Sequence, residues 1–295
     1  MNESSLFRGL IQSKDGFLKF WNRFKKNKAA LLGLFIFTFF FFIAVFAPYL
    51  SPHDPFEMNF MDPEAPFKPP SREHPLGTDG FGRDQLSRLM HGARTSLFIG
   101  LLSTSICTSI GVVLGSISGY YGGRVDMIIM GVVDTVLMIP GFFLILIGAA
   151  VFGNSIWHVM WIIGLINWPG IARLVRAEFL SIKDMDYVKA ARAAGATNFH
   201  IVFKQILPNA FFPVIVNASM RVSAAIMTEA SLSFLGLGDP NAVSWGWLLN
   251  EAMRAFRSAW WLSFFPGLTI TLIAIGFNLI GDGLNDALNP HLKER

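Results

Sequence analysis

The sequence predicts an all-α integral membrane protein with six transmembrane helices. Of its 295 residues, 53% are hydrophobic and only 15% are charged, which is too apolar for an ordinary soluble protein. The mean hydropathy of +0.48 agrees with this. A helix that crosses a bilayer needs about 20 mostly apolar residues. Windows of that kind lie at 29–47, 96–121, 127–152, 156–171, 211–235 and 261–280.

The first window follows a basic lead-in over residues 1–28. Four aromatic residues recur there at helical spacing, with basic residues between them: Phe17, Phe20, Trp21 and Phe24. This pattern predicts an amphipathic helix on the inner membrane surface, with a disordered basic tail as the alternative. We expect the window to be a retained span, because its apolar run is longer than that of a cleaved signal and Pro48 stands where the mature chain would begin.

Residues 48–95 separate the first two windows, and eight prolines fall between positions 48 and 75. That density precludes long helices and predicts an extended external loop.

The second window then carries a glycine at every fourth position: Gly111, Gly115, Gly119 and Gly123. Such spacing predicts the close approach of a neighbouring helix. Cys107, the only cysteine, is expected to pack in this span as a small apolar residue.

The remaining windows complete the predicted bundle. The third and fourth contain Pro140 and Pro169, which a bundle tolerates because neighbouring groups satisfy the freed carbonyls. The fifth and sixth flank a segment that we predict to be a structured external turn. Its marker residues are Gly236, Gly238, Pro240, Ser244, Trp245 and Gly246.

Basic residues set the expected orientation. They are concentrated in residues 1–28 and 172–205, whereas residues 48–95 hold more acids than bases. Under the positive-inside rule both termini and the 172–205 loop are cytoplasmic, which agrees with an even number of spans. The net charge of +4 therefore mostly reflects the basic residues that set the orientation in the membrane. We expect membrane lipid as a neighbour and no nucleic-acid partner.

A polar, alanine-rich segment between the fourth and fifth windows predicts a helical hairpin. Asp186 is the predicted N-cap of its first helix and Gly195 the predicted stop, because glycine tolerates the left-handed conformation. Thr197 is predicted to cap a second short helix that ends near Pro208. Small side chains keep the first helix slim: Ala190, Ala191, Ala193 and Ala194. A slim helix favours docking into a groove of another protein, and a surface hairpin that binds nothing is the alternative.

Three ionisable residues lie within apolar windows: Asp134, Arg221 and Glu229. Because a charge at membrane depth costs at least about 2.5–3.5 kcal/mol on insertion scales, these side chains should face the bundle interior, a partner or water. Arg221 and Glu229 lie about 12 Å apart along a helix, too far for a direct ion pair. Either residue contacts cargo in a pathway or has a structural role.

No catalytic motif is present in the sequence. It has no Gly-Lys pair and therefore no phosphate-binding loop, and it has neither G-x-S-x-G nor H-E-x-x-H. We therefore predict that the chain is not an enzyme and has no catalytic residue. The six histidines are scattered along the sequence: His53, His74, His91, His158, His200 and His291. We expect each to be solvated or packed, and we predict no metal site.

The hairpin segment resembles the cytoplasmic loop of bacterial ABC-importer permeases, which reads E-A-A, three residues, Gly, nine residues, I-x-L-P. Lys189-Ala190-Ala191, Gly195 and Leu207-Pro208 match this pattern, while Lys189 replaces the Glu and Gln205 the Ile. The run from His74 to Asp84 and residues 231–251 are similar to the dipeptide/oligopeptide/nickel branch. The resemblance covers about residues 20 to 290.

This resemblance implies the type I ABC-importer permease fold, with a core permease domain over 96–285, a coupling loop over 178–207 and a cytoplasmic tail over 286–295. It implies import of peptides, with nickel, glutathione or oligosaccharides as other cargoes of the branch. The implied partners are a second permease, two cytoplasmic ATPases that use ATP and Mg²⁺, and an external substrate-binding protein; no cofactor is expected on this chain. The residues implied to dock the ATPase are Asp186, Tyr187, Lys189, Ala190, Ala191, Gly195, Leu207 and Pro208.

Two other classes of function remain open at this point. An ion-coupled secondary transporter would use Asp134, Arg221 and Glu229 as a charge relay and would transport alone, leaving the hairpin without a role. A membrane scaffold that transports nothing would need no polar path through the bundle. Co-purification of an ATPase separates both from an ABC permease.

Overall fold

The structure, a computed structural model, describes residues 14–58 and 65–288, and within these ranges the chain is helical and forms no strand. Five helices are long and apolar enough to cross a membrane. They are α3 (Lys28–Leu50), α4 (Gln85–Tyr121), α7 (Ile156–Ile182), α10 (Leu207–Phe234), which continues a helical stretch that begins at Asn198, and α12 (Trp261–Leu288).

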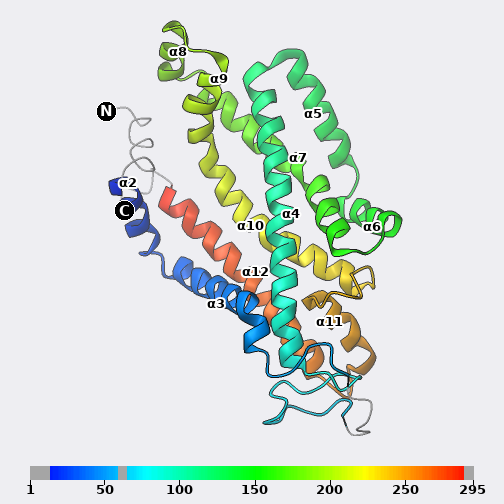
Figure 1. Ribbon diagram of the computed structural model, residues 1–295. Helices are drawn as coiled ribbons and strands as arrows, with labels where there is room; N and C mark the ends of the chain where they lie inside the picture. The colour runs from blue at the N-terminus through cyan, green and yellow to red at the C-terminus, as the bar shows by residue number, and fades with distance from the viewer. Residues whose placement is uncertain (1–13, 59–64, 289–295) are drawn as a thin grey trace.

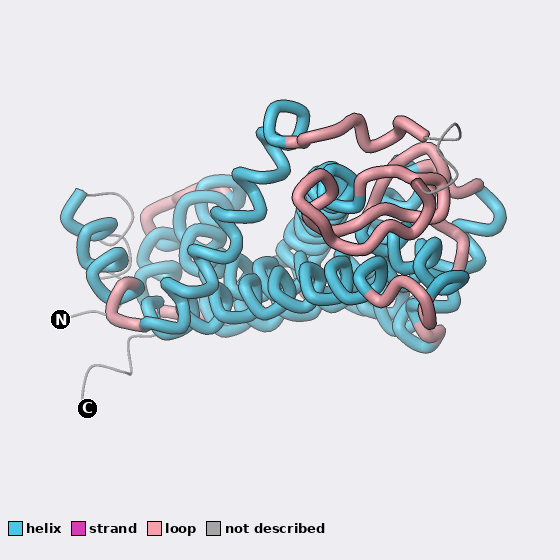
Figure 2. The backbone as a smooth tube through the Cα atoms, turned by 90° about the horizontal axis from the view of Figure 1, so that it is seen from below, coloured by secondary structure: helices cyan, strands magenta, loops and turns pink. Residues whose placement is uncertain are grey.

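The long helices form an elongated bundle in which α4 runs along the length of the molecule (Figure 1). On one side of α4 lie α3 and α12, and on the other α5 (Gly123–Met138) and α6 (Gly141–Phe152). One end of the bundle carries α8 (Asp186–Ala193) and α9 (Asn198–His200), and we call it the hairpin end. The opposite end holds α11 (Trp245–Ala252), η2 (Met253–Ala255) and the described parts of residues 51–84. We call it the loop end, and Figure 2 shows its loops gathered over the ends of the helices.

The glycines of α4 bring this helix against α7, as the sequence predicts. A Cβ atom added to Gly111 would lie 2.5 Å from the Cβ of Ile171, and one on Gly119 would lie 2.6 Å from the Cβ of Phe179. No side chain fits in that contact, so the two backbones approach closely. Gly123 differs from the prediction: it starts α5 with φ +54° and no atom within 4 Å of an added Cβ.

The predicted third span is not one straight helix. It divides into α5 and α6, which are bent by 82° at the break. Ile139, just before Pro140, is extended with φ −93° and ψ 129°, because the proline ring disfavours the helical conformation of the residue that precedes it. The described residues therefore hold five helices long and apolar enough to span a membrane, or six spans when the bent pair counts as one.

Several helices extend beyond their apolar windows. α3 passes through Pro48 and ends at Leu50, so the predicted loop starts later than expected. α4 starts at Gln85, where the side chain of Asp84 accepts a hydrogen bond from the Ser87 amide as the N-cap. α7 continues to Ile182, through part of the region expected to be a cytoplasmic loop. Hydropathy detects the apolar part of a helix and not its capped polar ends.

The predicted lead-in helix is α2 (Lys14–Phe24); residues 1–13 of the lead-in lie outside the described residues. Phe24 is buried with Ala30 of α3 and Ala287 of α12, whereas Trp21 is exposed. The lead-in therefore packs against the last turns of α12 through one face.

Candidate functional site

The hairpin begins where α7 ends, and its first helix differs slightly from the prediction. Asp186 is the first residue of α8, and Met185 is the N-cap, without a side-chain hydrogen bond. Met185 is the residue with extended φ and ψ, so the helix starts at Asp186, one residue earlier than a cap at Asp186 would place it. The Asp186 carboxylate still lies in the first turn, where it interacts favourably with the helix dipole.

The predicted stop at Gly195 is observed. The Ala196 amide donates to the Ala191 carbonyl at 3.1 Å, and the Gly195 amide donates to the Arg192 carbonyl at 3.0 Å. These two bonds form a Schellman motif, which requires the left-handed conformation that Gly195 adopts with φ +81°. Thr197 then accepts a bond from the His200 amide, as predicted for a cap.

The second helix does not end at Pro208. α9 continues through a π-helical turn, η1 (Ile201–Ile206), directly into α10. Pro208 lies in the first turn of α10, where its ring removes one backbone N–H donor from the helical path. The proline therefore marks the junction between the π-helical turn and the α-helix, and the helical path continues into the membrane.

One face of the hairpin packs on its own chain. Val188 is fully buried between the end of α7 and the start of α10, in a cluster with Ile182, Ile201 and Ile206. The Tyr187 hydroxyl accepts a hydrogen bond from the side-chain nitrogen Nδ2 of Asn209 at 3.2 Å. These contacts hold α8 against its own chain, and the hairpin projects from the end of the bundle.

The other face of the hairpin is exposed and carries small residues beside two aromatic rings. Lys189, Ala190 and Gly195 are exposed, and a Cβ added to Gly195 would meet nothing within 4 Å. Phe199 is 72% exposed and Phe203 48%, with ring centroids 4.5 Å apart. The sequence reasoning missed these two residues, although two phenylalanines four positions apart in a polar hairpin are a visible signal.

The remaining predicted docking residues lie around this face with different exposure. Pro208 is exposed, whereas Ala191 and Leu207 are half-buried. Tyr187 is half-buried and belongs mainly to the packed side. The predicted set thus divides into residues that hold the hairpin and residues that present its free surface.

Arg221 lies in the middle of α10 and borders a small cavity of about 30 Å³. Its Nε donates to Asn217 Oδ1 at 2.8 Å, and one terminal nitrogen donates to the Asn167 carbonyl of α7 at 3.3 Å. Other cavity residues include Ser103, Thr104, Asn167 and Thr228. The arginine therefore lies in a polar pocket between α4, α7 and α10.

The structure does not bring the three predicted pathway residues together. Asp134 pairs with Arg173 at 2.6 Å, and both side chains are more than half exposed, so Asp134 does not face the bundle interior as part of a central path. Glu229 is buried near the loop end and accepts from the Ser233 hydroxyl at 2.6 Å. Each ionisable residue thus has its own partner, and no contact links the three into a relay.

A second ion pair joins the same two helices. Arg176 of α7 forms two hydrogen bonds to the Asp126 carboxylate of α5, at 2.5 and 2.6 Å. Together with Arg173 and Asp134, this pair fixes α5 against α7 beyond the apolar window. The sequence reasoning counted both arginines as loop residues and missed the pairing.

At the loop end, the predicted turn is tightly packed against α4 and α10. Gly236 has φ +84° just after α10, and Ser244 caps α11 by accepting from the Trp247 amide. Trp245 is fully buried and its indole Nε1 donates to the Leu89 carbonyl at 3.1 Å. A Cβ on Gly246 would lie 2.5 Å from the Cα of Ala230, so this contact requires glycine.

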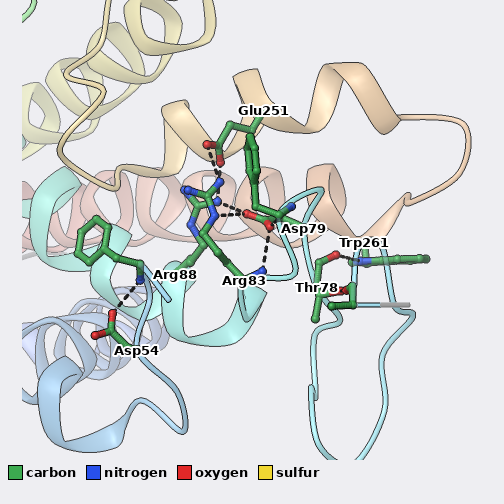
Figure 3. Close-up of polar contacts among 10 residues, drawn as sticks. Asp54, Thr78, Asp79, Arg83, Arg88, Glu251 and Trp261 are labelled. Atoms are coloured by element: carbon green, nitrogen blue, oxygen red, sulfur yellow. Dashed lines mark hydrogen bonds and ion pairs between the residues drawn. The ribbon is translucent and has the colours of Figure 1, made fainter. Parts of the chain in front are cut away.

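Four charged residues form a cluster beside this turn (Figure 3), in which Asp79, Arg83 and Arg88 are buried and Glu251 is half-buried. Arg83 donates to Asp79 at 2.7 Å and to Glu251 at 2.9 Å. Arg88, whose side chain is 2% exposed, bonds the same two carboxylates. A cleft of about 410 Å³ opens beside the cluster and is lined in part by Phe67, Phe81 and Trp247. Glu251 lies 168 positions after Arg83, and no sequence pattern predicted that pairing.

The histidines are not all scattered, contrary to expectation. His53 and His74 lie side by side at the loop end, with ring centroids 4.7 Å apart. His74 Nδ1 is 2.9 Å from Asp84 Oδ1. Residues that are far apart in the segment between α3 and α4 thus meet at the start of α4.

The comparisons with known proteins agree with this architecture. Residues 111–294 match the family described as binding-protein-dependent transport system inner membrane component. Residues 17–70 match the N-terminal TM domain of oligopeptide transport permease C. The chain belongs to this transport family. It is accordingly a multi-pass permease component of an ABC importer in the inner membrane, and it is not itself an enzyme, since the ATPase is a separate subunit.

Several relatives are similar over nearly the whole chain. The dipeptide transport system permease protein DppC of Escherichia coli K12 is 45% identical over 94% of this chain and 93% of its own. DppC of Bacillus subtilis 168 is 40% identical over 92% of this chain and 85% of its own. Inward-facing structures of the MetNI methionine ABC transporter share the fold, with a TM-score of 0.55, 21% identity and coverage of 68% of this chain and 97% of that one.

Proposed function

We propose that this protein is a permease subunit of a peptide importer and that its hairpin transmits ATP-driven motion from cytoplasmic ATPases. The observation that carries the proposal is the two-sided hairpin. Val188 anchors one face to α7 and α10, while Phe199, Phe203 and the small residues around Gly195 leave the other face free. Peptide cargo is supported by relatives named dipeptide permeases at about 40% identity.

The proposed assembly contains a second permease, two ATPases that use ATP and Mg²⁺, and an external substrate-binding protein. A projection with an exposed aromatic pair suits a groove on the ATPase, because buried aromatics commonly dominate the energy of such interfaces. The exposed apolar surface of α5 and α6, for example Met138 and Val151, is then available to lipid or to the sister permease.

The docking test uses variants at two exposed positions of the hairpin, Phe199 and Gly195. Phe199→Ala and Gly195→Asp should each reduce recovery of the ATPases with the purified membrane subunits and lower ATP-dependent uptake in reconstituted vesicles. Phe256→Ala, which removes a similarly exposed ring at the loop end (66% exposed), should leave ATPase recovery unchanged. Gly195→Asn is the matched control for the glycine, because Asn tolerates positive φ without adding charge. Full ATPase recovery with both Phe199→Ala and Gly195→Asp would refute docking at this face.

The orientation in the proposal places the hairpin end in the cytoplasm, on the basis of the basic residues near residues 1–28 and the hairpin. In a Cys107→Ser background, Phe256→Cys should react with an impermeant thiol reagent added to intact cells. Lys189→Cys, which is also exposed, should react only after the membrane is opened. External labelling of Lys189→Cys would reverse the orientation and remove the docking proposal with it.

Arg221 is proposed to face the transport path and to contact the carboxylate of a peptide. Support comes from its mid-helix position and from the polar cavity it borders. Arg221→Gln should lower uptake while the assembled complex keeps its basal ATPase activity. Loss of assembly would instead assign the arginine a structural role, and unchanged uptake would remove it from the path.

A further inference from the structure

Two histidines and an aspartate meet at the loop end, outside every site described so far. One donor atom from each of His53, His74 and Asp84 lies within 4.8 Å of the other two. His74 Nδ1 is 2.9 Å from Asp84 Oδ1, and His53 Nδ1 is 3.8 Å from the same oxygen. Both imidazole rings therefore face the same carboxylate oxygen, Asp84 Oδ1.

The Asp84 carboxylate is fixed in place by its other oxygen. Asp84 Oδ2 accepts from the Ser87 amide and from the Ser87 hydroxyl, both at 2.8 Å. The backbone amide of His53 in turn donates to the Ser87 hydroxyl at 3.1 Å. Hydrogen bonds of this kind orient the ligands of metal sites, and here they leave Oδ1 directed at the two rings.

The arrangement leaves one buried atom unsatisfied. His53 Nδ1 is buried without a hydrogen-bond partner, and its distance to Asp84 Oδ1 exceeds hydrogen-bond range. A buried polar atom of this type normally has a partner. A cation between the three side chains would satisfy His53 Nδ1 and the free lone pairs of Asp84 Oδ1 together.

We propose that His53, His74 and Asp84 bind one divalent transition-metal ion of the zinc class. Imidazole nitrogen and a carboxylate oxygen are ligands of Zn²⁺ at about 2.0–2.2 Å, and tetrahedral ligands at that distance lie about 3.4 Å apart. The observed separations of 2.9 and 3.8 Å bracket this value. Ca²⁺ and Mg²⁺ prefer oxygen ligands only, which the two imidazoles do not offer.

Three protein ligands leave the fourth position open to water or another donor. The ion would link residue 53, just after α3, to residue 74 and to the N-cap of α4. It would thereby hold the two ends of the segment between α3 and α4 together at the start of α4. The site does not depend on the proposed transport function, because its ligands lie far from the hairpin.

The test measures metal binding by the purified full-length protein, produced with an affinity tag free of histidine and stripped with a chelator. Titration with Zn²⁺ should give one bound ion per chain and a higher thermal unfolding midpoint, because a ligand of the native state stabilises it. Co²⁺ should produce the visible absorption of a site with nitrogen and oxygen ligands.

Three variants remove the ligands one at a time: His53→Ala, His74→Ala and Asp84→Asn, the last of which keeps a residue able to cap α4. Each should weaken Zn²⁺ binding by at least about tenfold, because even second-shell changes cost 10–100-fold. His158→Ala, an exposed histidine elsewhere, should bind as the wild type does. If the wild type binds no Zn²⁺, or if His53→Ala and His74→Ala bind it unchanged, the cluster is a hydrogen-bonded His–Asp group and the proposal is wrong.

Discussion

At the loop end, charged side chains are buried and paired within the chain, whereas at the hairpin end polar and aromatic side chains remain exposed. Arg83 and Arg88 share the carboxylates of Asp79 and Glu251, and the loops around them pack on Trp245 and Trp261. At the other end, the rings of Phe199 and Phe203 are exposed and lie against each other. The arginine–carboxylate cluster at the loop end is therefore paired within the chain, whereas the aromatic pair at the hairpin end remains exposed.

This difference implies that substitutions at the two ends act on different quantities. A change within a buried charge cluster lowers the free energy of unfolding, since it leaves an ion without its partner. A change on an unpartnered surface leaves folding nearly unaffected and acts on assembly. Stability and ATPase recovery, measured on the same variants, therefore separate the two ends.

The largest effect is expected for Arg88→Met at the loop end. Removing one member of a buried ion pair typically costs about 3–5 kcal/mol, and the Arg88 side chain is 2% exposed. Thermal unfolding in detergent should show a much lower midpoint. Arg254→Met, an exposed arginine nearby, is the control and should unfold as the wild type does. Equal midpoints for both variants would mean that the cluster contributes little to stability.

A smaller effect is expected for Gly195→Ala in the hairpin. An added Cβ meets no neighbour, so the cost comes from the left-handed backbone alone, about 1–2 kcal/mol. This cost should appear as faster amide hydrogen exchange in α8, with little change in the global midpoint. A Gly267→Ala variant, at a helical glycine that is also without a neighbour within 4 Å, should leave exchange in α8 unchanged.

The smallest effect on stability is expected for Phe199→Ser combined with Phe203→Ser. Exposed positions away from special features usually change stability by less than about 0.5 kcal/mol, so the unfolding midpoint should stay the same while ATPase recovery falls. A large loss of stability would show that the two rings support the fold, and the contrast between the two ends would disappear.

Local chemistry was predictable from the sequence. The Gly195 stop, the Thr197 cap and the glycine face of α4 follow from rules that act within a few residues. The bend at Pro140 was not predicted, because hydropathy measures apolar content and not helix direction. The contacts of Arg83 with Glu251 and of Arg176 with Asp126 join segments 168 and 50 positions apart. Such pairs depend on how helices pack, which a single sequence does not record.

The helical path from Asn198 to Phe234 connects these two ends mechanically. Its 37 residues correspond to a rod about 55 Å long, and Arg221 lies about 33 Å along it from Phe199. No loop interrupts this distance, and the two places in it where a helix commonly bends are the π-helical turn η1 and Pro213. A rotation of 5° about one end would carry the other through about 5 Å, comparable to one turn of helix. The hairpin and the polar pocket thus lie on one continuous helical path.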